Sequence, residues 1–161
     1  MEFLDWLGHS PLGVWVSEYQ LAYYGLLAGH AIGMSIVGGI VFILGARILG
    51  FSKALPFEVF EQLYRLAWAG FGLNLLTGLL LFAANGRHLI ENRPFLLKLT
   101  FIALGGLTLW ALTRSLRAEP TGFATGGPAS ARSRSIALLM LLLWTAAIIS
   151  GRVIAYTIKY V

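Results

Sequence analysis

The sequence predicts an all-α integral membrane protein: a four-helix bundle preceded by a short N-terminal interfacial helix. Its composition is the first indication, because 58% of the 161 residues are hydrophobic and only 12% are charged. The mean hydropathy of +0.77 is the second. The third is a set of four apolar segments, each reaching the roughly 20 residues that a helix needs to cross a bilayer. A soluble domain of this size is far less apolar, so we expect the lipid bilayer to be the main partner.

The first ten residues, MEFLDWLGHS, have the pattern of a short amphipathic helix. Glu2 and Asp5 stand where a cleaved signal peptide carries basic residues, so we expect no such peptide here. Phe3, Trp6 and their apolar neighbours would rest on the bilayer surface. A Ser-Pro-Leu-Gly sequence then separates this helix from the first span.

Four predicted spans and three connections account for the rest of the chain. Asn85-Gly86-Arg87 is expected to end the second span, and Pro94 suits the first turn of the third. The stretch 117–133, rich in Gly, Pro, Ser and Ala, is predicted to be a loop. No segment is left for a soluble domain, so residues 1–161 form a single transmembrane domain. Its expected spans are 17–49, 57–84, 94–116 and 134–160.

The basic residues predict the orientation of the spans. Six of the twelve lysines and arginines lie in the connections 45–57 and 114–134, whereas the opposite face carries both signs of charge. The positive-inside rule then places both termini in the periplasm, if the membrane is a bacterial inner membrane. The basic residues that give the net charge of +5 are scattered around apolar segments and form no patch. It therefore does not indicate a nucleic-acid partner.

His30 is the residue of greatest interest, because it lies inside the apolar segment Leu21–Leu44. An ionisable side chain is costly in hydrocarbon and usually faces the bundle interior, where it marks a ligand, ion or proton site. It lies about nine residues, or roughly 14 Å, from the outer end of its span. Gly33 and Met34 share its helix face, and Asn74 is a candidate hydrogen-bond partner of the imidazole. The ring can serve as a structural partner, a haem or metal ligand, or a proton carrier.

Lys98 and Arg152 lie in the outer half of the third and fourth predicted spans. In one interpretation both extend to lipid phosphates. In the other they form a basic pocket that holds an anionic group. Haem b fits this pocket, with iron on His30 and propionates on the two cations. Gly33 would leave room for such a flat group, and a quinone or copper is the alternative cofactor.

A metal site built from histidines is a further interpretation. His9, His30 and His88 are the three histidines, and none forms an i, i+4 pair. His9 and His88 are both expected at the outer surface, where they would bind copper or zinc. The absence of cysteine excludes thiolate sites and disulfides. No nucleophile elbow or phosphate-binding loop is present, so we expect no catalytic residue.

Short motifs follow one another in a specific order along residues 3–110. They are FLDWLGHSPLGVWV, the H-x-x-G of His30, the sequence Arg47-Ile48-Leu49-Gly50, GFGLNLLTGLLLF at 70–82, and N-R-P-F-x-x-K at 92–98. In these motifs the chain resembles an uncharacterised family of small bacterial four-helix inner-membrane proteins, similar in layout to the copper-resistance D proteins. The resemblance implies the fold but no activity. The chain departs from the family at Ala46, where an acid is usual, and at Thr113, where a histidine is expected.

The leading hypothesis is a small non-catalytic membrane subunit for electron transfer, which binds haem b or a quinone near the outer leaflet. A component of copper or small-solute transport is the first alternative. A structural accessory subunit that binds lipid is the second. A chain with so little extramembrane mass is expected to work with other membrane subunits or as a homo-oligomer.

Overall fold

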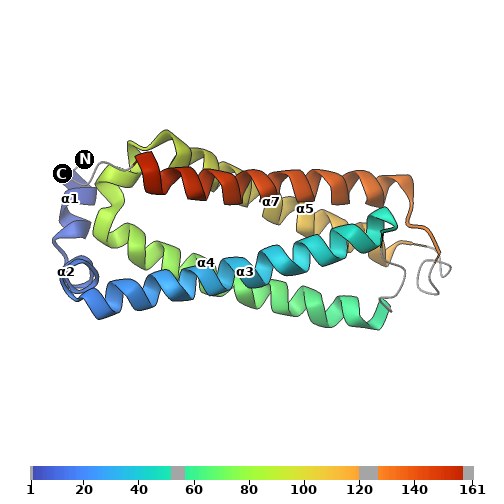
Figure 1. Ribbon diagram of the computed structural model, residues 1–161, viewed down its shortest axis with the longest axis horizontal. Helices are drawn as coiled ribbons and strands as arrows, with labels where there is room; N and C mark the ends of the chain where they lie inside the picture. Colours follow the sequence, from blue (N-terminus) through green and yellow to red (C-terminus); the bar gives the residue numbers. More distant parts are fainter. Residues whose placement is uncertain (1, 52–56, 120–126, 158–161) are drawn as a thin grey trace.

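Figure 1 shows a bundle of long helices with two short helices at one end. The computed structural model describes residues 2–51, 57–119 and 127–157, and every secondary-structure element in these ranges is a helix. The short helices are α1 (Glu2–Gly8) and α2 (Pro11–Glu18). The long helices are α3 (Gln20–Leu49), α4 (Phe57–Ile90), α5 (Arg93–Arg117) and α7 (Ala131–Thr157). All four are long and apolar enough to cross a membrane, which confirms the predicted all-α membrane bundle.

The N-terminal region forms two helices where the sequence predicted one. Ser10 caps α2, because its hydroxyl accepts a hydrogen bond from the Gly13 N–H and Pro11 occupies the first helical position. Tyr19 has extended backbone angles, so α2 ends there and α3 begins at Gln20. Both short helices lie across the long axis of the bundle (Figure 1). They also pack against α4, and we call their end of the bundle the outer end.

The second predicted span is longer than expected. Asn85 leaves the helical region with φ −128° and ψ 17°, but it only kinks α4, which continues to Ile90. Contacts with α1 hold this last part, where Arg87 forms an ion pair of 2.8 Å with Asp5. The predicted break at 85–87 is therefore present as a kink at Asn85, beyond which a short helical segment continues to Ile90.

The other two spans lie close to their predicted positions. α5 covers Arg93–Arg117, and Asn92 caps it by accepting a hydrogen bond from the Phe95 N–H. α7 begins at Ala131, three residues before the prediction, because the Ser130 hydroxyl accepts from the Ser133 N–H. The predicted end of this span at residue 160, and part of the predicted loop 117–133, lie outside the described residues.

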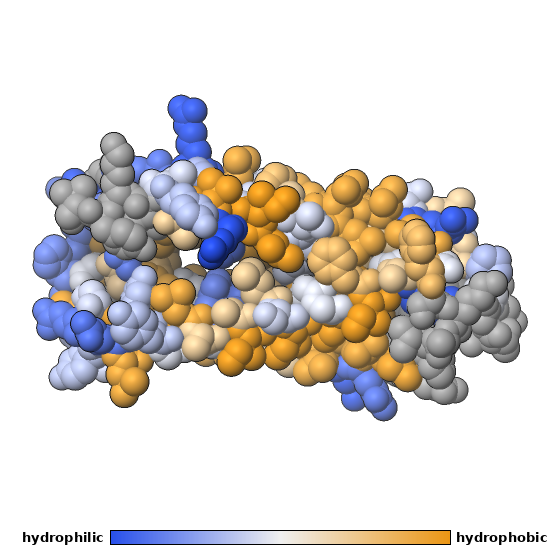
Figure 2. Space-filling view, in the orientation of Figure 1, coloured by the Kyte–Doolittle hydropathy of each residue, from blue (hydrophilic) through white to orange (hydrophobic). Residues whose placement is uncertain are grey.

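The helices pack as two pairs, α3 with α4 and α5 with α7, which are joined by contacts between α3 and α7. The buried core lies mainly in the half of the bundle away from the termini. Its members include Val37, Val41, Leu44, Leu112, Met140 and Trp144. Contacts between α4 and α5 are few. Figure 2 shows the surface hollowed between α7 and the α3–α4 pair in the outer half of the molecule. Between α3 and α7 the bundle is thus closed in its inner half and open in its outer half.

The backbones of α3 and α4 approach closely at Gly33. A Cβ atom there would lie 2.8 Å from both the Asn74 amide nitrogen and the Gly70 carbonyl oxygen, which are backbone atoms of α4. A hydrogen in place of a side chain lets the two backbones touch, as is usual between membrane helices. Gly33 therefore sets the crossing of this pair. It does not leave the space for a flat cofactor that the sequence suggested.

We predict that Gly33→Ala destabilises the bundle by about 1–3 kcal/mol, the usual cost of overpacking. Gly39→Ala is the matched control, because nothing lies within 4 Å of a Cβ at that position of the same helix. The measurement is unfolding in detergent by thermal or SDS titration. Equal stability of the two variants would contradict the proposed crossing.

Candidate functional site

His30 and Lys98 meet in the outer half of the bundle. The Lys98 Nζ atom lies 3.3 Å from the His30 Nε2 atom, although the two residues come from α5 and α3. Both side chains are partly buried. An ammonium group can only donate, so Lys98 donates a hydrogen bond to the Nε2 lone pair of a neutral imidazole. The contact therefore links the two helix pairs through one hydrogen bond.

Thr77 of α4 fixes the other side of the ring. Its Oγ1 atom lies 3.2 Å from His30 Nδ1, and its hydroxyl donates to the Leu73 carbonyl oxygen at 2.7 Å. Because that hydroxyl has a single proton, its oxygen accepts from the Nδ1–H of His30. The network therefore assigns the tautomer with the proton on Nδ1 and the lone pair on Nε2.

Two glycines form the walls against which these side chains pack. A Cβ at Gly78 would lie 3.1 Å from His30 Cε1, and one at Gly151 would lie 3.5 Å from the Lys98 methylenes. The imidazole thus lies against α4, and the lysine stem lies across α7. All four long helices contribute to the site, which leaves both polar groups only partly covered.

The sequence suggested a hydrogen bond between Asn74 and the imidazole, but Asn74 bonds to the backbone of His30 instead. Its Nδ2 atom donates to the backbone carbonyl oxygen of His30 at 2.8 Å. This hydrogen bond does not involve the imidazole ring. It fixes the position of α3 along α4. Thr77 is the residue that the sequence analysis missed. It lies three positions after Asn74, so it shares the same face of α4 and is a polar residue in an apolar helix.

Arg152 does not join Lys98 in a shared basic pocket. Its side chain is exposed, and its guanidinium lies over the ring of Tyr156 at 5.4 Å from the centroid. The two residues differ in direction because rotation about each helix axis decides where a side chain points. Met34 is half-buried on α3, one turn from His30. Met34 and His30 lie on the same face of α3. Met34 therefore cannot bind a cofactor from the side opposite to the His30 ring.

The outer histidines are exposed and separate from this site. His9 donates from Nδ1 to the Asp5 carbonyl oxygen at 2.7 Å, a bond within its own helix end, and His88 lies on the surface. Among the residues that the structure describes, no three His, Asp or Glu side chains are grouped to hold a metal ion. The expectation of a copper or zinc site thus finds no support in the geometry.

Haem b fits these residues poorly. The hydrogen bond from Nδ1 to Thr77 is of the kind that orients a metal-binding histidine. The Nε2 atom that would bind iron instead accepts from Lys98. Neither Arg152 nor Met34 is placed as the haem interpretation requires. The arrangement is better suited to a ligand that accepts hydrogen bonds.

An apolar groove lies on two of the helices that carry the polar site. It has a volume of about 410 Å³ and lies between α4 and α5, where these helices diverge. Ile102, which lines it, follows Lys98 by one turn on α5, and Phe71 precedes Asn74 by three residues on α4. The groove continues along α5 to Trp110, about 12 Å further at the helical rise. A polar site and an apolar groove therefore follow one another along the same pair of helices.

Comparisons with known proteins add no family to this picture. The chain matches no protein-family model, no curated protein and no solved structure. The resemblance to the small four-helix inner-membrane proteins therefore remains a prediction from its motifs.

We predict that Thr77→Val disturbs the tautomer of His30, because the Nδ1–H loses its acceptor. The expected cost in stability is about 1 kcal/mol, the usual net value of a hydrogen bond. Thr100→Val is the control, since its hydroxyl also donates to a carbonyl of its own helix but is exposed. ¹⁵N NMR of the imidazole nitrogens measures the tautomer. A His30 spectrum unchanged by Thr77→Val would show that the threonine does not orient the ring.

Proposed function

We propose that the protein is a small membrane subunit that binds an isoprenoid quinone in its outer half and serves electron transfer beside a larger redox partner. The observation that carries the proposal is the hydrogen bond between Lys98 and His30 at the opening between the helix pairs. Ligand sites combine a mostly apolar lining with a few convergent polar groups, and this site has that composition.

The head group of a quinone suits the polar pair. Its carbonyl oxygens accept hydrogen bonds, and an ammonium has three donors, of which one is directed at His30 Nε2. Reduction of the ring to the quinol takes up two electrons and two protons. The redox partner would supply the electrons, while Lys98 and His30 are the titratable groups nearest to the site and would exchange the protons.

The tail of a quinone suits the apolar groove. Trp68, Phe71 and Trp110 are among its lining residues, and its wall is almost entirely apolar. An isoprenoid chain leaving the head group would follow this groove between α4 and α5. The rigid, flat macrocycle of haem carries no long apolar chain that would fill the groove, so the groove favours quinone over haem.

We predict that Lys98→Met weakens binding of decylubiquinone at least about tenfold, because a hydrogen bond from a charged group contributes about 1.5–3 kcal/mol. The protein is placed in lipid nanodiscs, and retained quinone is quantified by extraction and chromatography across a titration. Arg152→Gln is the matched control: it also removes a cation from the outer half, but its side chain lies over Tyr156. Equal loss in both variants would refute a specific role of Lys98.

The absorption spectrum of the purified protein separates quinone from the alternatives. We predict no Soret band when haem precursors are supplied during expression, and quinone in the organic extract. A Soret band that disappears in His30→Ala would support haem b in place of quinone. A colourless protein with stoichiometric copper would support the metal-handling alternative. If neither cofactor is found and a partner copurifies stably, the result would support the structural accessory subunit.

A further inference from the structure

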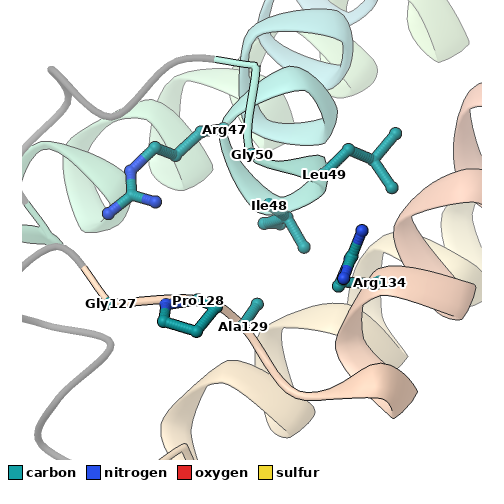
Figure 3. A pocket seen from close by; sticks show the side chains of 8 residues that line it. All are labelled: Arg47, Ile48, Leu49, Gly50, Gly127, Pro128, Ala129 and Arg134. Atoms are coloured by element: carbon teal, nitrogen blue, oxygen red, sulfur yellow. The ribbon is translucent and has the colours of Figure 1, made fainter.

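A second cavity lies at the inner end of the bundle, far from the quinone site. Its volume is about 310 Å³, and it separates the end of α3 from the start of α7 (Figure 3). Figure 3 shows the side chains of Arg47 and Arg134 on two sides of it, with Pro128 and Ala129 along a third.

The backbone at the end of α3 contributes shape to this cavity and little charge. Gly50 has a φ of 93°, a left-handed conformation that ends the helix at low cost for glycine. Its N–H donates to the Arg47 carbonyl oxygen, and the Phe51 N–H donates to the Ala46 carbonyl oxygen. These two donors are therefore used within the chain and are not offered to a ligand.

Some of the donors at the start of α7 are also used within the chain. The Glu119 carboxylate accepts from the Ser130 N–H and hydroxyl and from the Ser133 hydroxyl. Hydrogen bonds from Ser130 and Ser133 lower the pKa of the Glu119 carboxyl, which therefore stays ionised at neutral pH. This carboxylate already takes the role that an anion would have at the helix start. The arginine side chains therefore supply the positive charge that an anionic ligand of the cavity would meet.

We propose that the cavity binds a phosphate group between Arg47 and Arg134. Guanidinium groups bind phosphate through paired, charge-assisted hydrogen bonds, and arginine is the residue best suited to this geometry. Arg47 is only 4% exposed and also takes part in an interaction within the chain. Arg134 is exposed at the rim, so it can adjust to a ligand.

A phospholipid head group and free phosphate share this chemistry. The volume lies at the small end of known ligand pockets, so it suits a phosphate with a small attached group. In Figure 2 the apolar band along the bundle gives way to polar surface toward its ends. Basic pockets between membrane helices at this level commonly hold anionic head groups.

The test measures the thermal stability of the delipidated full-length protein in phosphate-free detergent. The added probes are dioctanoyl phosphatidylglycerol, dioctanoyl phosphatidylcholine and sodium phosphate, at constant ionic strength. We expect phosphatidylglycerol to raise Tm in a saturable manner, with phosphatidylcholine much weaker. Arg134→Gln should weaken the apparent affinity about tenfold, in the range of a charge-assisted hydrogen bond. Arg132→Gln is the matched control, because it removes an exposed arginine of the same turn that does not line the cavity.

The outcomes decide between the sources and the proposal itself. Stabilisation by phosphatidylglycerol but not by phosphate identifies a lipid head group, and equal stabilisation by phosphate identifies a free anion. Both support the proposal if Arg134→Gln weakens the effect and Arg132→Gln does not. The proposal is wrong if no probe stabilises the protein, or if the two variants respond alike. Quinone binding does not enter this test, so either proposal can fail alone.

Discussion

The hydrogen bond from Lys98 to His30 is the constraint on which the outer half of the structure depends. Lys98 lies about one and a half turns inside α5, where an ammonium group in hydrocarbon needs an acceptor or a route to water. The His30 Nε2 lone pair supplies the acceptor at 3.3 Å. It is available because Thr77 keeps the ring proton on Nδ1, and Thr77 does so because its own proton is used by the Leu73 carbonyl. The position of one cation on α5 is thus determined through α3 by a hydroxyl on α4.

This polar chain lies in the half of the bundle that is packed less tightly. Away from the termini, α3 and α7 approach closely enough that a Cβ at Gly45 would lie 2.7 Å from a Leu141 methyl group. The buried core of α3, α5 and α7 is gathered in that half. Toward the outer end the two helix pairs separate, and their separation gives Lys98 room to reach across Gly151. The packed half supplies the stability, and the open half keeps polar groups accessible.

Hydropathy predicted the fold and the approximate limits of all four spans, because a bilayer requires about 20 apolar residues whatever the packing. Hydropathy says little about how each helix is rotated about its own axis. α3 is apolar on nearly every side, and each residue turns the side-chain direction by about 100°. The contacts of Asn74 with the His30 carbonyl oxygen and of Arg152 with Tyr156 were therefore not predicted. His30 and Lys98 were recognised because ionisable residues are rare in hydrocarbon. Thr77 was missed because a threonine usually satisfies its hydroxyl on its own helix, as this one also does.

The two proposed sites share helices but not contacts. α3 carries both His30 and Arg47, which are 17 residues or about 26 Å apart along the helix. Between them lie Gly33, which rests on α4, and Gly45, which meets Leu141 of α7. Both approaches leave little space for a side chain, so they allow α3 to pack closely on α4 and on α7. A phosphate at the inner end would add a link between α3 and α7 where they already touch. It would therefore hold the closed half of the bundle and leave the opening at Lys98 unchanged, so the two ligands should bind independently.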